Sequence, residues 1–136
     1  MIRLSFDRIV RRLFQERLPR VDLVLAVAEG GLVPGALAAL RLGVPMGTVR
    51  VRFRDKGNRE IYKAPRVFKR PVIPRGVRSV LIADDVSVTG KTLEAARALV
   101  PRTVKVRTLV LKGRADIVLF PEIRPCVNWP WNKLRS

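Results

Sequence analysis

Two adjacent carboxylates followed by a turn of hydroxyl groups form the densest group of reactive side chains in this sequence. The stretch reads Asp84-Asp85-Val86-Ser87-Val88-Thr89-Gly90-Lys91-Thr92. Hydroxyl donors and the free N–H groups at the start of a helix suit a phosphate. Neighbouring carboxylates repel a phosphate, but they accept hydrogen bonds from ribose hydroxyls or bind a magnesium ion. The chemistry indicated is therefore the binding of a sugar phosphate.

The flanking residues predict the elements that position this group. Ser79–Ala83 is a short apolar run typical of a buried strand, and Thr92–Leu99 has the composition of a helix. Ligands of open α/β sheets bind beyond the carboxyl ends of the strands. We therefore expect the two acids and the turn to lie at that edge of a sheet.

The ending Gly90-Lys91-Thr92 also invites comparison with a nucleotide-binding P-loop. That motif requires a further glycine five positions before Gly90, where this chain has Asp85. A P-loop is therefore excluded. The plainer alternative is a helix cap with solvated acids, but the combination of strand, paired acids, hydroxyl turn and helix favours a ligand site.

The rest of the chain alternates between predicted strands and helices. A helix begins after the cap residue Ser5 and closes near Arg17, and a second helix covers Leu32–Leu42. Further strands are predicted at Val21–Val27, Met46–Phe53, Val104–Leu111 and Ile117–Phe120, with strand pieces at Ile61–Tyr62 and Arg66–Phe68. This order predicts an α/β fold with a largely parallel sheet flanked by helices, in one domain over residues 1–136.

Composition narrows the possible functions. Without histidine, and with Cys126 as the one cysteine, the chain has no histidine-based triad, no histidine metal site and no internal disulfide. Any metal is expected to be a hard cation such as Mg²⁺. The formal net charge of +17 favours polyanionic partners, either nucleic acid or a phosphate-rich substrate. Without a membrane-length apolar run or signal-like N-terminus, we expect a cytoplasmic protein with no membrane partner.

The stretch Val80–Thr92 resembles the phosphoribosyl pyrophosphate signature of the type I phosphoribosyltransferases. A second stretch, Glu29–Ala38, is similar to the pyrophosphate loop and following helix of the xanthine-guanine and hypoxanthine branch. Lys112 matches the lysine that reads a 6-oxopurine, and Trp129-Pro130-Trp131 resembles that branch's base-covering segment. The basic residues 54–76 fall where the family carries its flexible lid loop, and 113–136 would be the small C-terminal hood.

The resemblance implies a glycosyltransferase of purine salvage and nucleotide metabolism, which joins ribose 5-phosphate to a base and releases pyrophosphate. Its implied partners are phosphoribosyl pyrophosphate, a nucleobase and other copies of the chain, as a dimer or tetramer. Asp84 and Asp85 would hold the ribose and support Mg²⁺. The 5-phosphate would be bound by Ser87, Val88, Thr89, Gly90, Lys91 and Thr92, the pyrophosphate by Ala28, Glu29, Gly30 and Gly31, and the base by Lys112, Cys126, Val127 and Trp129.

Three positions depart from the family pattern. Val88 replaces the aspartate that faces the purine, Glu29 replaces a basic residue of the pyrophosphate loop, and Cys126 replaces the aromatic residue that stacks on the base. Two hypotheses follow. The first is an active purine phosphoribosyltransferase. The second is a catalytically inactive protein of the same fold that binds nucleotide or RNA through its basic surface.

Overall fold

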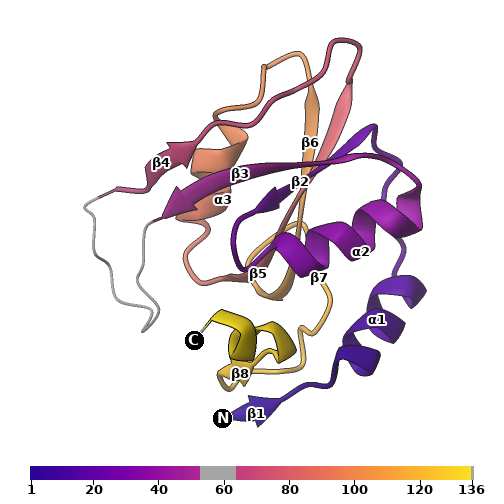
Figure 1. Cartoon of the computed structure of the whole chain (residues 1–136), viewed down its shortest axis with the longest axis vertical. Helices are drawn as coiled ribbons and strands as arrows, with labels where there is room; N and C mark the ends of the chain where they lie inside the picture. Colours follow the sequence, from indigo (N-terminus) through magenta and orange to yellow (C-terminus); the bar gives the residue numbers. More distant parts are fainter. Residues whose placement is uncertain (53–63, 136) are drawn as a thin grey trace.

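The computed structural model describes residues 1–52 and 64–135. Its centre is a six-stranded sheet with the strand order β4-β3-β2-β5-β6-β7 (Figure 1). The strands are β2 (Leu23–Val27), β3 (Met46–Arg52), β4 (Arg66–Lys69), β5 (Ser79–Ser87), β6 (Lys105–Gly113) and β7 (Ile117–Val118). Only the β3–β4 pair is antiparallel within this described sheet. The predicted α/β class with a largely parallel sheet is confirmed.

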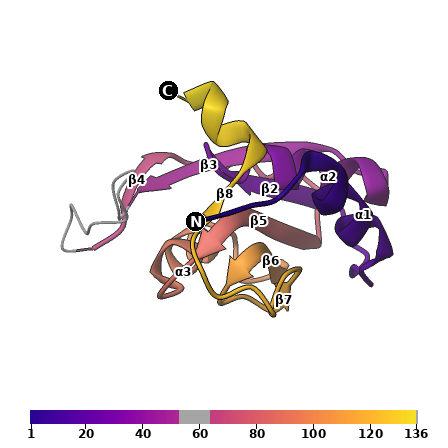
Figure 2. The same ribbon diagram turned by 90° about the horizontal axis from the view of Figure 1, so that it is seen from below.

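Helices cover both faces of the sheet. α1 (Phe6–Gln15) and α2 (Leu32–Leu42) pack on one face, and α3 (Lys91–Arg97) packs on the other (Figure 2). Side chains of the central strands alternate between the two cores: Leu81 belongs to the first, and Val80 and Ile82 belong to the second. A parallel sheet buried on both faces requires the nearly continuous apolar strands that this sequence contains.

The predicted helix ends near the N-terminus match the structure closely. Ser5 caps α1, with its hydroxyl accepting a hydrogen bond from the amide of Arg8 at 3.1 Å. α2 ends at Gly43, whose φ of 68° lies in the left-handed region that favours glycine. Local side-chain chemistry therefore determines these boundaries.

Two boundaries around the acid pair were predicted wrongly. β5 continues four residues past the expected end at Ala83, to Ser87, and so includes both aspartates. Its extension is paired with β6, with Val86 opposite Lys112 and Ser87 opposite Gly113. α3 ends at Arg97, before the expected Leu99. Pairing with a distant strand, which local composition does not reveal, extends β5.

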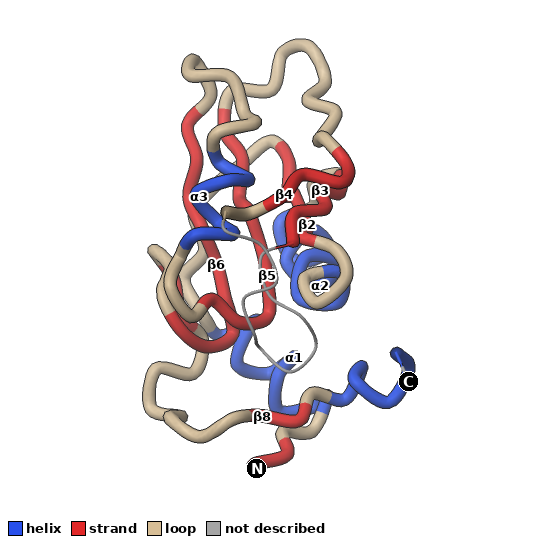
Figure 3. Tube along the Cα trace, turned by 90° about the vertical axis from the view of Figure 1, so that its left-hand side faces the viewer, coloured by secondary structure: helices blue, strands red, loops and turns tan. Residues whose placement is uncertain are grey.

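The segment 125–131 contains a short strand. β8 (Val127–Asn128) pairs in parallel with β1 (Ile2–Arg3), so a segment near the C-terminus lies beside the N-terminal strand (Figure 3). The 3-10 helix η1 (Pro130–Arg135) follows. Two-residue strands carry no recognisable periodicity, and their formation depends on the partner segment. The predicted strand piece at Ile61–Tyr62 lies outside the described residues, whereas Arg66–Phe68 falls within β4.

The described helices include none that is long and apolar enough to cross a membrane.

Candidate functional site

The acid pair lies near the carboxyl end of β5. The side chain of Asp84 is buried, and its Oδ1 accepts a hydrogen bond from the amide of Asp85 at 2.8 Å. Asp85 is half-buried, and its Oδ1 accepts from the amide of Val86 at 2.7 Å. These local hydrogen bonds orient both carboxylates at the edge of the sheet where α/β proteins bind their ligands.

The loop between β2 and α2 lies directly against Asp85. A Cβ atom added at Gly30 would stand 2.5 Å from Oδ2 of Asp85, so only glycine allows this approach. In the same loop, the peptide bond between Ala28 and Glu29 is cis. The structure therefore brings together the predicted pyrophosphate loop and the predicted ribose-binding acid, which are more than 50 residues apart in sequence.

Two backbone amides of this loop form hydrogen bonds to carbonyl groups of the sheet strands. Ala28 N donates to the carbonyl of Val49 at 2.8 Å, and Gly31 N donates to that of Val27 at 2.7 Å. The amides of Glu29 and Gly30 donate to no acceptor in the part of the chain that the structure describes. These two N–H groups are therefore the loop's candidate donors to a pyrophosphate.

The carboxylate of Glu29 pairs with a strand residue. Its Oε1 lies 3.3 Å from the guanidinium of Arg50 on β3. Both side chains are about two-fifths exposed, so the pair contributes little to stability. The ion pair nevertheless offsets part of the negative charge that Glu29 introduces beside the candidate pyrophosphate site.

The predicted 5-phosphate residues form the turn from β5 into α3. Gly90 has φ = 87°, and the hydroxyl of Thr89 accepts a hydrogen bond from the amide of Lys91 at 3.3 Å. Val88 and Thr89 are exposed. Ser87 differs, because its hydroxyl is buried and has no hydrogen-bond partner among the described residues. In the rest of the turn, Lys91 is exposed like Val88 and Thr89, and Gly90 and Thr92 are half-buried.

A cavity of about 700 Å³ opens beside this turn. It is lined by Val86, Ser87, Val88, Lys112, Gly113, Arg114, Val118, Phe120, Pro121, Ile123 and Arg124. Three residues predicted from the sequence, Ser87, Val88 and Lys112, therefore meet at one cavity. Two lining cations, Arg114 and Arg124, were not predicted, although Arg114 is only two residues beyond Lys112.

The wall that carries Lys112 is held by main-chain contacts to β5. Arg114 N donates to the carbonyl of Ser87 at 2.8 Å. Gly113, opposite Ser87, has φ = 113°, and any Cβ there would collide with the Ser87 carbonyl. A residue other than glycine would therefore push the two strands apart at the cavity.

The remaining predicted base-binding residues do not line this cavity. Cys126 is exposed, and Val127 is half-buried in β8. Trp129 is buried in the core, with its ring stacked on that of Trp131 at a centroid distance of 5.6 Å. Their roles toward a base stay predictions, but the structure gives Trp129 a packing role.

A helix at the opposite end of the chain anchors the far wall of the cavity. The guanidinium of Arg12 on α1 lies over the Phe120 ring, 4.4 Å from its centroid, and donates to the carbonyl of Leu119. Arg12 also pairs with Glu122 at 2.8 Å, and this hydrogen-bonded pair lowers the pKa of Glu122 from 4.5 to about 2. Sequence analysis did not identify this anchor.

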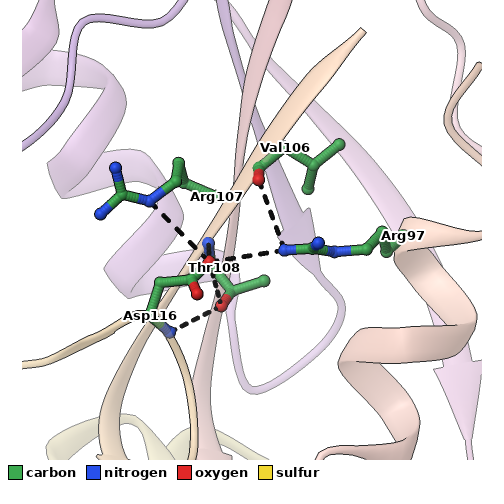
Figure 4. Close-up of polar contacts among 5 residues, drawn as sticks. All are labelled: Arg97, Val106, Arg107, Thr108 and Asp116. Atoms are coloured by element: carbon green, nitrogen blue, oxygen red, sulfur yellow. Dashed lines mark hydrogen bonds and ion pairs between the residues drawn. The ribbon is translucent and has the colours of Figure 1, made fainter. Parts of the chain in front are cut away.

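The turn after β6 is fixed by Asp116 (Figure 4). Its Oδ2 accepts from the amide of Thr108 at 3.0 Å and from the Thr108 hydroxyl at 3.1 Å. Arg97 of α3 and Arg107 approach the same oxygen at 3.4 and 3.9 Å. This network ties α3 to the strand that carries Lys112.

The described residues contain no cluster of three or more acidic, cysteine or histidine side chains suited to a metal. Asp84 and Asp85 carry hard carboxylate oxygens. Such a pair fits Mg²⁺ that is shared with substrate oxygens, because Mg²⁺ is usually bound by one or two carboxylates plus phosphates.

The strand order of the sheet, with the acid pair and the glycine loop at one edge, is that of the type I phosphoribosyltransferase fold. The sequence matches the phosphoribosyl transferase domain family over residues 4–122, and the chain belongs to that family. The orotate phosphoribosyltransferase of Streptococcus agalactiae is 29% identical over 96 residues, which are 71% of this chain and 43% of that protein. This chain thus spans less than half the length of the curated relatives it matches.

Solved structures match nearly the whole chain. A purine phosphoribosyltransferase from Pyrococcus horikoshii is 25% identical, with a TM-score of 0.67 over 96% of this chain and 92% of that one. The Helicobacter pylori xanthine-guanine-hypoxanthine phosphoribosyltransferase superposes with a TM-score of 0.79 over 99% of this chain and 98% of that one. At 15% identity, this second match demonstrates the shared fold alone.

Proposed function

We propose that this chain is a pentosyltransferase that moves ribose 5-phosphate from phosphoribosyl pyrophosphate to a 6-oxopurine and releases pyrophosphate. The observation that carries the proposal is the contact between the Gly30 loop and Asp85. It brings a candidate pyrophosphate loop within contact distance of a candidate ribose-binding acid. Lys112, on the cavity wall next to the same turn, supports an oxygen-bearing base.

Each group has a role in this reaction. The amides of Glu29 and Gly30 hold the leaving pyrophosphate, and the turn Val88–Thr92 holds the 5-phosphate. Asp84 and Asp85 hold the ribose hydroxyls and would also hold Mg²⁺, which supplies charge neutralisation for the pyrophosphate. Because the transition state resembles an oxocarbenium ion, positioning and charge stabilisation supply most of the catalysis. The lid expected at 54–76 lies partly outside the described residues, and its exclusion of water stays a prediction.

The test is pyrophosphate release from phosphoribosyl pyrophosphate and Mg²⁺, with guanine, xanthine, hypoxanthine, adenine and orotate in parallel. The control is the double variant Asp84→Asn/Asp85→Asn. Turnover with an oxopurine that is lost in the control supports the proposal. The absence of turnover with every base would contradict it.

A second candidate substrate is orotate, because the curated relatives are orotate phosphoribosyltransferases. These relatives share only part of their length with this chain, whereas the Pyrococcus horikoshii purine enzyme matches along nearly all of it. Preferential turnover of orotate over every purine would establish this alternative.

A non-catalytic role is the alternative from a different class. Val88, Glu29 and Cys126 depart from the family pattern, and the net charge of +17 favours a polyanionic partner. A protein of this kind would bind a nucleotide or RNA without turnover, and its RNA affinity would fall steeply with added salt. Oligomerisation as a dimer or tetramer also remains a proposal, which sedimentation would test.

A further inference from the structure

We propose that the cavity beside the acid pair selects a negatively charged nucleobase, and that Arg114 and Arg124 are the residues that determine this specificity together with Lys112. The inference rests on the proposed transferase reaction and specifies its acceptor. The acceptor class is an acidic base, either a dioxopurine or a carboxylated pyrimidine.

The charge of the cavity lining is the first argument. Three cations, Lys112, Arg114 and Arg124, line the cavity, and its described lining includes no carboxylate. Glu122 lies between two lining residues, but its carboxylate is paired with Arg12 of α1. The remaining lining side chains are mostly apolar. A concave surface that has apolar walls and only positive charges attracts an anion strongly.

Hydrogen-bond chemistry is the second argument. Lysine and arginine side chains only donate, so they match carbonyl or carboxylate oxygens of a base. The one other hydrogen-bonding side chain in the lining, Ser87, has a buried hydroxyl. The exocyclic amino group of a neutral base such as adenine is itself a donor, and it would face the donor groups of these three cations. Such a mismatch discriminates strongly between substrates.

The position of the cavity is the third argument, because its lining is separate from most of the residues proposed for the phosphate groups. The lining includes the first two residues of the phosphate turn, Ser87 and Val88, but none of Thr89–Thr92. It also excludes the acid pair and the Gly30 loop. The three cations therefore share a cavity with the start of the phosphate turn, but not with Thr89–Thr92, the acid pair or the Gly30 loop.

The experiment compares kcat/KM for orotate, xanthine, hypoxanthine, guanine and adenine in the wild-type protein, in Arg114→Gln and in Arg124→Gln. Arg102→Gln is the matched control, because Arg102 is exposed in the segment before β6, at the opposite end of that strand from Lys112. We expect an acidic base to be preferred and each cavity variant to lower kcat/KM for it at least tenfold. The KM for phosphoribosyl pyrophosphate should stay unchanged, and the control should match the wild type.

The outcomes separate this inference from the proposed reaction. Preferred turnover of a neutral base, whether adenine, guanine or hypoxanthine, would overturn the inference and leave the transferase intact. A rise in the KM for phosphoribosyl pyrophosphate with no change in that for the base would also overturn it, because the cations would then serve a phosphate. A preference for xanthine or for orotate supports the inference and identifies the acidic nucleobase that is the acceptor.

If no base is turned over, the transferase proposal fails and calorimetry tests the cavity directly. Orotate, xanthine and adenine would be titrated into the wild-type protein and the three arginine variants. Binding of an acidic base that weakens tenfold in Arg114→Gln and Arg124→Gln, but not in Arg102→Gln, supports the inference. Equal binding of adenine, or no binding of any base, overturns it.

Discussion

The indole N–H of Trp131 donates a hydrogen bond to Oδ2 of Asp85 at 3.4 Å. The C-terminal segment thereby contacts the acid proposed to hold the ribose. The Trp131 side chain is buried, with 6% exposed, whereas Asp85 is half-buried, so the contact joins the core to the candidate site. The orientation of Asp85 therefore depends on a residue 46 positions away in the chain.

Replacing Trp131 by phenylalanine should impair substrate binding through Asp85. The variant keeps an aromatic ring but removes the N–H donor, which is worth about 1–3 kcal/mol when its acceptor is charged. We expect kcat/KM for phosphoribosyl pyrophosphate to fall about fivefold or more in steady-state assays. Ile9→Val, which trims a buried side chain of the same core, controls for lost stability. Equal losses in both variants would contradict the positioning role.

Gly30→Ala should affect activity more than folding. A Cβ there would meet the carboxylate of Asp85 at 2.5 Å, and the side chain of Asp85 would have to move. We expect kcat to fall at least about 100-fold, as is typical when a catalytic group is misplaced by about 1 Å, while the Tm changes by only a few degrees. A variant with wild-type kcat would mean that Asp85 does not hold the ribose.

Glu29→Gln should improve binding of phosphoribosyl pyrophosphate. The carboxylate lies in the proposed pyrophosphate loop, so its removal relieves a like-charge repulsion. A gain of about 0.5–1 kcal/mol, in the range of exposed charge interactions, corresponds to a KM about two to five times lower. Arg50→Gln should have the opposite effect, because it removes the cation that pairs with Glu29. We expect its KM for phosphoribosyl pyrophosphate to rise. Both changes should shrink as salt is added.

The Arg12–Glu122 pair should stabilise the cavity wall in a pH-dependent manner. Since folding lowers the pKa of Glu122 from 4.5 to about 2, the pair contributes fully above pH 4.5 and is lost as the pH falls to about 2. A double-mutant cycle measures the coupling free energy between the two side chains. It compares the thermal unfolding of the wild type, Arg12→Gln, Glu122→Gln and the double variant. The coupling should be present at neutral pH and decline through this range. A coupling that is independent of pH would show that the carboxylate charge is not responsible.

Most of the framework was predictable because its causes are local. The hydroxyl of Ser5 and the left-handed Gly43 mark helix ends by their own chemistry. Apolar runs between turns predicted the central strands, and the paired acids with their hydroxyl turn indicated where a sugar phosphate would bind. Lys112 was predicted to face the base, and it lines the cavity beside Val88.

Only the tertiary structure decided which distant side chains meet. The pairing of β5 with β6 carries the strand through Asp84 and Asp85, and packing places Trp129 in the core. Arg114 and Arg124 line the cavity, whereas Arg102, of the same residue type and also exposed, does not. Residue type and local spacing determine caps, strands and turns, because these form among near neighbours. The lining of a cavity depends on strand register and the packing of remote segments, which no local pattern encodes.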